Sequence, residues 1–297
     1  MRVSGDWMKH AFLALMVLAP ALPLPAQAVP GISLPDTLGS FEFRDHRGDT
    51  SRPIKVWYYR PANAPAKRVV FLLHGSSRTG QQAQQLGAAY ARKHNVILVA
   101  PEFSQQHYPD LSYDFGSVMD ENQRLRPDSL WALNIIEHLF DAVVAQAKVE
   151  DRQSYDLVGH SAGGQFINRM VLLMPAARYR RAVISSPGRY LMADNAVSYP
   201  YGLGGTRVDS ASLARSFARD VVVILGDRDV ADQARQWEPE TMLQGKNRFA
   251  RGLRFVAASV EQAFRLATPL SWRLQIVHGV DHDPPTMVRA ALEALAP

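Results

Sequence analysis

The 297-residue sequence contains no cysteine. Disulfide bonds, zinc sites built from thiolates and cysteine nucleophiles are therefore all excluded. The nine histidines include no His-Glu-x-x-His helix motif, which is the pattern of a helix-borne zinc site. No metal site is expected.

The sequence also lacks any block of charge of one sign. The formal net charge is +5, and the positive residues are scattered along the chain. The densest group, Arg178, Arg180 and Arg181, lies at an expected helix–strand junction and is read as a solvated face. Nucleic-acid binding would need a clustered basic stripe with interleaved aromatic residues, so no nucleic-acid partner is expected.

The N-terminus has the organisation of a secretion signal. Basic residues precede an apolar run at 11–19, and the segment ends in the small-x-small pattern Ala26-Gln27-Ala28, which is typical of a cleavage site. We interpret residues 1–28 as a signal peptide and 29–297 as the mature chain. The protein is therefore expected to be exported to the periplasm or the medium.

Two further features of this segment bear on its interpretation. Met1 and Met8 are both candidate translation starts, since Lys9 and His10 directly precede the apolar run. The run is too short and too interrupted by proline to span a bilayer. Because no cysteine follows the cleavage site, a stable lipid anchor is not expected.

About 270 residues remain after cleavage, enough for one large domain with a substantial core. Apolar runs of strand length alternate with helical patterns, and several runs are near-continuous Val, Ile and Leu, as in parallel strands covered on both faces. The expected strands lie at 54–59, 68–73, 96–100, 155–158, 182–185, 221–225 and 272–277. The expected helices lie at 81–94, 127–148, 161–174, 210–218, 247–267 and 284–296. This alternation predicts a single α/β domain with a mostly parallel sheet, helices on both faces and no large cap.

Two connections are longer than such a sheet needs, at 101–126 and 187–207. The second carries several aromatic residues among glycine and proline, so it is a candidate pocket wall or short lid. The alternative is an ordered loop whose aromatic side chains pack into the core. On the first interpretation, Tyr190 and Tyr201 contact the substrate.

Gly159-His160-Ser161-Ala162-Gly163 stands between an expected buried strand and an expected helix. A G-x-S-x-G bracket in this context is typical of a nucleophile elbow, where a sharp turn projects the serine hydroxyl from the end of the sheet. Ser161 is the predicted nucleophile. The N–H of Ala162, at the start of the helix, is a predicted donor to an oxyanion, and His160 is expected to contact the substrate.

The predicted acid follows the strand at 221–225. On sheets of this kind the catalytic residues follow the chain order serine, acid, histidine. Gly226-Asp227-Arg228-Asp229 places two carboxylates at the rim where ligands bind in open α/β sheets. Asp229 is predicted to be the acid, and Asp227, which would otherwise cap the turn, is the alternative.

The predicted base follows the last strand. His282 lies in a loop that can fold back over the rim, whereas His278 directly continues the strand and is the alternative. Asp283 followed by Pro284 has the pattern of a helix N-cap with proline at the first helical position. A neutral imidazole at His282 would accept the hydroxyl proton of Ser161, and the carboxylate would orient the imidazole.

The second oxyanion donor is expected in the loop after the strand at 68–73, which begins His74-Gly75-Ser76-Ser77. Glycine there lets the backbone approach the substrate closely. The N–H of Ser76 is the predicted donor and that of Ser77 the alternative, and Ser77 is also expected to contact the substrate. His74 is read as a structural histidine hydrogen-bonded beneath the loop.

With these motifs in place, the chain from about residue 54 onward resembles the α/β-hydrolase-fold serine hydrolases. Within them it is similar to the secreted bacterial esterases grouped with poly(3-hydroxybutyrate) depolymerases and feruloyl esterases. The resemblance implies hydrolysis of carboxylic esters, in small or polymeric substrates, through an acyl-enzyme and without a metal or organic cofactor. Two departures from that group are the absence of disulfides and of a separate polymer-binding domain.

Alternative functions share the fold. A polyester depolymerase, a peptidase and an acyltransferase use the same three residue types and differ in pocket shape, so the sequence does not separate them. A binding protein that has lost catalysis would show a broken set of catalytic residues. Here Ser161, Asp229 and His282 occur in the required order.

Overall fold

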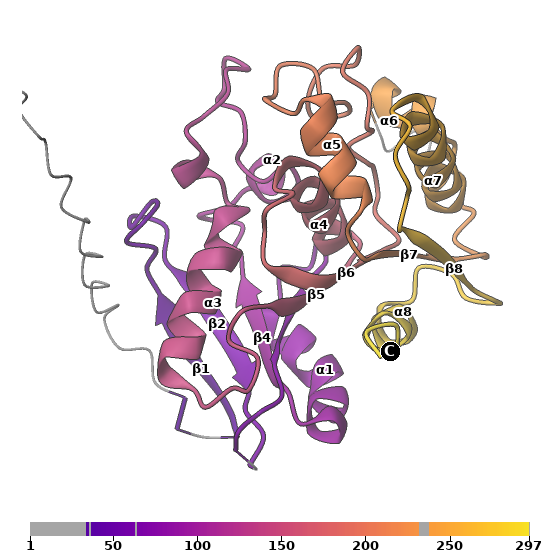
Figure 1. Ribbon diagram of the computed structural model, residues 1–297. Helices are drawn as coiled ribbons and strands as arrows, with labels where there is room; N and C mark the ends of the chain where they lie inside the picture. Colours follow the sequence, from indigo (N-terminus) through magenta and orange to yellow (C-terminus); the bar gives the residue numbers. More distant parts are fainter. Residues whose placement is uncertain (1–33, 36, 63, 232–237, 297) are drawn as a thin grey trace, which may run out of the picture.

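The computed structural model describes residues 34, 35, 37–62, 64–231 and 238–296. Its centre is an eight-stranded sheet with the order β1-β2-β4-β3-β5-β6-β7-β8 (Figure 1). The strands are β1 (Leu38–Phe43), β2 (Ile54–Tyr59), β3 (Val69–Leu73), β4 (Ile97–Glu102), β5 (Tyr155–His160), β6 (Tyr179–Ser185), β7 (Val221–Gly226) and β8 (Arg273–Val277). Strands β3 to β8 are parallel, and β1 and β2 pair antiparallel at one edge. The predicted α/β fold class is therefore confirmed.

Helices cover both faces of this sheet. The helices are α1 (Gly80–His94), α2 (Asp110–Asp114), α3 (Asn134–Gln146), α4 (Ala162–Leu173), α5 (Ser210–Phe217), α6 (Pro239–Gln244), α7 (Arg248–Arg265) and α8 (Pro284–Glu293), with a short 3₁₀ turn, η1, at Asp128–Leu130. Helices α1 and α8 pack together on one face, and α3, α4 and α7 contribute to the larger core on the other (Figure 1). None of the helices in the described ranges is both long and apolar enough to cross a membrane. The predicted signal peptide lies outside the described residues.

Strand β1 was not expected from the sequence. Its exposure alternates between exposed and half-buried positions, and only Phe43 is fully buried. An edge strand that covers one face of the sheet does not need the continuous apolar run that marks the central strands. The short helices α2 and α6 were also missed, because five or six residues are too few to show a helical period.

The single helix predicted at 127–148 is wrong in its first part. Residues 128–130 form η1, and α3 begins only at Asn134. Trp131 between them has extended backbone angles and is buried, with its indole N–H donating to the carbonyl of Arg126 at 3.1 Å. Burial of this large ring, with its N–H hydrogen-bonded, stabilises the extended conformation of Trp131 and interrupts the helix.

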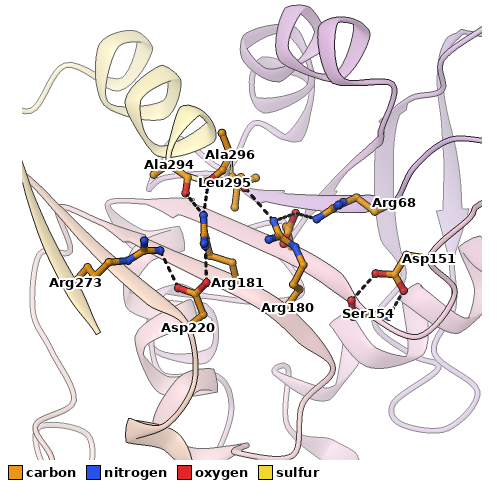
Figure 2. Close-up of polar contacts among 11 residues, drawn as sticks. Arg68, Asp151, Ser154, Arg180, Arg181, Asp220, Arg273, Ala294, Leu295 and Ala296 are labelled. Atoms are coloured by element: carbon orange, nitrogen blue, oxygen red, sulfur yellow. Dashed lines mark hydrogen bonds and ion pairs between the residues drawn. The ribbon is translucent and has the colours of Figure 1, made fainter. Parts of the chain in front are cut away.

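Helix α8 is held to the sheet at the end opposite the loop that carries His282. The guanidinium of Arg181 donates to the carbonyl of Ala294 at 2.9 Å and to Asp220 at 2.7 Å, and that of Arg180 donates to the carbonyl of Leu295 at 3.0 Å (Figure 2). Carbonyls at a helix C-terminus lack intrahelical donors, and cations there also oppose the helix dipole. The arginines expected on a solvated face are thus partly buried anchors.

His74, directly after β3, anchors the following loop from below. Its Nε2 accepts the N–H of Phe103 at 3.0 Å, and its Nδ1 lies 2.9 Å from the carbonyl of Gly75. A neutral imidazole with the proton on Nδ1 satisfies both contacts, whereas a second proton would break the bond to Phe103. Burial lowers the pKa of His74 to about 4. His74 is therefore a structural residue, as the sequence indicated.

The arginine anchor can be tested by removing its charge. Arg181→Met should lower the free energy of unfolding by roughly 2–4 kcal/mol, because the partly buried carbonyls after α8 and the carboxylate of Asp220 lose a charged donor. Urea denaturation measures this change. Arg254→Met, at an exposed position of α7, is the matched control and should change the stability by less than about 0.5 kcal/mol. Equal effects of the two substitutions would contradict the anchoring role.

The burial of His74 predicts a pH dependence of stability. Between an ordinary pKa of 6.5 and the folded value of about 4, the unfolded chain binds a proton on this residue and the folded chain does not. The free energy of unfolding should therefore fall as pH drops from 7 to 4, by up to about 1.4 kcal/mol per pH unit from this group. His74→Gln should reduce the slope of stability against pH, measured by denaturation at several pH values. The exposed control His46→Gln should retain the slope of the wild type, and the same slope in His74→Gln would refute the assignment.

Candidate active site

Ser161 sits at a sharp turn between β5 and α4. Its backbone φ is 58° and its ψ is −116°, a strained combination for a residue with a side chain. Neighbouring glycines make the turn possible. A Cβ on Gly159 would lie 2.4 Å from the carbonyl oxygen of Gly163, and a Cβ on Gly163 would lie 2.4 Å from that of Leu73. The G-x-S-x-G motif therefore forms the expected elbow geometry.

Three side chains form a continuous hydrogen-bonded chain at this turn. The Oγ of Ser161 lies 3.0 Å from Nε2 of His282, and Nδ1 of His282 lies 2.8 Å from Oδ2 of Asp229. The three residues follow β5, β8 and β7, whose carboxyl ends meet at one edge of the sheet. The neutral imidazole with its proton on Nδ1 donates to Asp229 and accepts from Ser161, so one tautomer satisfies both contacts.

Asp229 is held in place by more than the histidine. Its side chain is only 4% exposed, and Oδ1 lies 3.6 Å from the guanidinium of Arg248 at the start of α7. Its carbonyl accepts the N–H of Phe249 at 3.2 Å. A buried carboxylate needs such charged or hydrogen-bonding partners. Arg248 was not identified from the sequence, since it lies 19 positions further along and no motif connects the two.

The alternative acid and base pair with each other. Nδ1 of His278 lies 2.9 Å from Oδ2 of Asp227, and the side chain of His278 is 84% exposed. His282, in contrast, is 26% exposed at its side chain and reaches back to Ser161. The structure thus joins Asp229 and His282 to the serine and leaves the other pair at the surface.

The two predicted oxyanion donors flank Ser161. Ala162 is the first residue of α4, where backbone N–H groups have no intrahelical acceptor. Gly75 passes close by, since a Cβ placed on it would lie 3.6 Å from the Cβ of Ser161, and Ser76 follows it along the pocket wall. Arg78 holds this loop by donating to the carbonyls of Phe103 and Tyr108, each at 2.9 Å.

A pocket of about 160 Å³ opens beside Ser161. Its inner wall is apolar and comes from β3, α1 and α8, and its lip is polar. The lining residues are Leu72, Leu73, His74, Gly75, Ser76, Ser77, Thr79, Gln82, Ala83, Leu86, His160, Ser161, His282, Pro284 and Val288. The predicted contact residues Ser77 and His160 are among them.

Tyr190 and Tyr201 do not line this pocket. Tyr190 is fully buried and stacks on Phe255 with ring centroids 4.6 Å apart, so its predicted contact with substrate is wrong. Tyr201 packs edge-on near Phe115, in the long connection between β6 and α5. Tyr190 and Tyr199 follow the alternative interpretation, in which the aromatic side chains pack inward, because burial of their rings is favourable, whereas Tyr201 is only half-buried.

His160 lies directly against His282. The two ring centroids are 4.6 Å apart, and Nδ1 of His160 lies 3.1 Å from Oγ of Ser185. Burial, reinforced by the neighbouring His282 and Arg248, lowers the pKa of His160 to about 3. The imidazole is therefore neutral at working pH and adds no positive charge beside His282.

Sequence reasoning missed the part of the pocket that helices provide. Thr79 and Gln82 form its lip, with the hydroxyl of Thr79 donating to Oε1 of Gln82 at 3.0 Å. Leu86 and Val288 form its inner wall. The sequence could have indicated both helices as pocket walls, because α1 begins directly after the predicted oxyanion loop and α8 directly after the predicted base, His282. Within the described ranges, no group of three or more His, Asp or Glu side chains is arranged to hold a metal ion.

No protein-family model matches the chain, and no curated protein matches it. Among solved structures it is similar to poly(aspartic acid) hydrolase-1 from Sphingomonas sp. KT-1, with 35% identity over 88% of this chain and 98% of that chain and a TM-score of 0.82. It is also similar to the poly(3-hydroxybutyrate) depolymerase LpqC from Bordetella parapertussis, with 28% identity over 87% and 88% of the two chains and a TM-score of 0.82.

A more distant similarity concerns the fold alone. The siderophore hydrolase EstB from Aspergillus nidulans is 14% identical over 89% of this chain and 94% of its own, with a TM-score of 0.53. The two nearer similarities extend over almost the whole length of the compared enzymes, and both of those enzymes are hydrolases. The chain belongs to the family of α/β-hydrolase-fold enzymes that includes this poly(aspartic acid) hydrolase and this poly(3-hydroxybutyrate) depolymerase.

Proposed function

We propose that the protein is an exported serine hydrolase that cleaves carboxylic esters through an acyl-enzyme. Ser161 is the nucleophile, His282 the general base and acid, and Asp229 the residue that orients the imidazole. The observation that carries this proposal is the hydrogen-bonded chain from Ser161 through His282 to Asp229, at 3.0 and 2.8 Å. A serine hydroxyl is a weak nucleophile without such a base.

The acylation step follows from the positions of these atoms. Nε2 of His282 takes the hydroxyl proton as Oγ of Ser161 forms a bond to the substrate carbonyl carbon. The carbonyl oxygen becomes an oxyanion, which the N–H groups of Ala162 and Ser76 stabilise. Asp229 stabilises the imidazolium without taking its proton. The tetrahedral intermediate then collapses, and the leaving alcohol departs with the proton from Nε2.

Deacylation repeats the sequence with water. His282 removes a proton from water, the resulting hydroxide equivalent attacks the acyl carbon, and Oγ of Ser161 leaves and recovers its proton. The products are a carboxylic acid and the regenerated serine. No step requires a metal or an organic cofactor.

The substrate is proposed to carry a short acyl unit. The pocket of about 160 Å³ is apolar within and polar at its lip, which suits a small repeat unit whose inner end is apolar. The two nearer relatives are a hydrolase of poly(aspartic acid) and a depolymerase of poly(3-hydroxybutyrate), so one acts on a polyamide and the other on a polyester. These names support a polymeric ester as a substrate and a polymeric amide as the second candidate.

Export is proposed on the N-terminal sequence. The basic start, the apolar run at 11–19 and the Ala26-Gln27-Ala28 pattern direct the chain across the inner membrane, to the periplasm or the medium. Neither a nucleic-acid partner nor a stable membrane anchor is part of the proposal. N-terminal sequencing of the exported protein should begin at Val29.

The nucleophile is tested by Ser161→Ala in the mature chain. Wild-type protein should hydrolyse p-nitrophenyl esters, with an optimum at short acyl chains, and should be labelled by a fluorophosphonate probe. The variant should not be labelled, and its kcat should fall about 10³-fold or more, because the attacking atom is absent. Circular dichroism and thermal unfolding should be unchanged. Undiminished turnover by a folded variant would overturn the proposal, whereas labelling without ester turnover would favour amide polymers, for which poly(aspartic acid) is the probe.

The acid is tested by Asp229→Asn, which preserves the size of the side chain. Asparagine can donate to Nδ1 and so favours the wrong imidazole tautomer, and kcat should fall roughly 10³- to 10⁴-fold. Asp281→Asn, an exposed change of the same kind in the neighbouring loop, is the matched control and should leave kcat within twofold. Equal kcat values for the two variants in steady-state kinetics would contradict the role of Asp229 as the acid.

A further inference from the structure

The pair formed by Asp227 and His278 joins the loops that follow β7 and β8, at the surface of the protein. Asp227 follows β7 two residues before Asp229, and His278 follows β8 four residues before His282. Both oxygens of the Asp227 carboxylate, in the loop after β7, contact groups in the loop after β8. Oδ2 contacts Nδ1 of His278 at 2.9 Å, and Oδ1 accepts the N–H of Gly279 at 2.7 Å.

Backbone contacts continue the same connection. The N–H of Asp227 donates to the carbonyl of Val277 at 3.3 Å, and that of Arg228 donates to the carbonyl of Val280 at 2.9 Å. Gly226 lies so close to the second loop that a Cβ on it would be 2.5 Å from the carbonyl oxygen of Val280. The loops after β7 and β8 are thus joined over several residues before either reaches the bond between Asp229 and His282.

The turn at the start of the second loop is exposed at His278 and Gly279. Strand β8 is the edge of the sheet, and its first three residues, Arg273 to Gln275, are exposed. Gly279 has a φ of +73°, and a Cβ placed on it would meet no atom within 4 Å, so the turn is made in open space. The carboxylate of Asp227 therefore adds side-chain contacts to the backbone hydrogen bonds that hold this exposed turn.

We propose that Asp227 is a positioning residue of the active site. Its carboxylate fixes the turn at His278 and Gly279 so that Nε2 of His282 lies within hydrogen-bonding distance of Ser161. The low pKa of Asp227, caused by its bonds to His278 and Gly279, keeps both acceptors available. This inference rests on the proposed function, because it assigns Asp227 a role in placing the proposed base.

Two variants separate the contacts. Asp227→Ala removes both acceptors, and kcat should fall roughly 10- to 100-fold, since a displacement of about 1 Å in a reacting group can cost 10²-fold. Asp227→Asn can still accept from Gly279 through Oδ1 but offers an N–H₂ group to His278, so its loss should be smaller. KM should stay within twofold for both, because Asp227 does not line the pocket beside Ser161. Asp281→Asn is the control for loss of one charge in the same region.

The measurement must distinguish positioning from a general loss of stability. Titration with a fluorophosphonate gives the concentration of competent sites, and kcat is calculated per labelled site. The labelling rate should fall in parallel with kcat, because both report the reactivity of Ser161. The downfield ¹H NMR resonance of the Nδ1 proton of His282 should broaden or shift in Asp227→Ala and remain in Asp281→Asn.

The outcomes separate this inference from the proposed function. A wild-type protein that is labelled at Ser161, together with an Asp227→Ala variant of equal kcat per site and equal labelling rate, would overturn the positioning role alone. A loss of activity explained entirely by fewer labelled sites would also overturn it. A folded wild type that is not labelled would overturn the proposed function and this inference with it.

Discussion

The crossing of β5 and α4 at the elbow is the constraint on which the rest of the site depends. Backbone atoms of Gly159, Gly163 and Leu73 approach so closely that no side chain fits between them. This crossing sets the backbone of Ser161 and the start of α4 together, and it brings β3 and the loop beyond Gly75 against the serine. The proposed nucleophile and both proposed oxyanion donors are therefore placed by one packing contact.

The histidine reaches the elbow by a different route. It lies on a loop between an exposed edge strand and α8, and each end of that segment has its own support. At the far end, Arg180 and Arg181 bind the last carbonyls of α8. At the near end, Asp283 caps the first turn by accepting the N–H of Thr286 at 2.9 Å. The position of His282 is thus fixed by polar contacts, whereas the position of Ser161 is fixed by close packing of the backbone.

The sequence was most informative where a residue type has one structural use. The glycines around Ser161, the continuous apolar strands and the Asp283-Pro284 cap all predict local structure that the protein adopts. Local patterns were less informative where a long-range contact decides the outcome. Trp131 is extended and buried within the first part of a predicted helix, Tyr190 packs into the core against Phe255, and Arg248 approaches Asp229 from the start of α7. No spacing along the chain encodes these contacts.

Loops and helices both line the pocket beside Ser161. The groups proposed for chemistry stand on loops at the rim, whereas the inner wall comes from Leu86 of α1 and Val288 of α8. These helices pack together on the face of the sheet opposite α4. Replacement of Leu86 or Val288 would therefore change the shape of the pocket without removing a member of the hydrogen-bonded chain from Ser161 to Asp229. Two proteins of this family can thus carry the same residues at the rim and still differ in the size of the group that the pocket accepts.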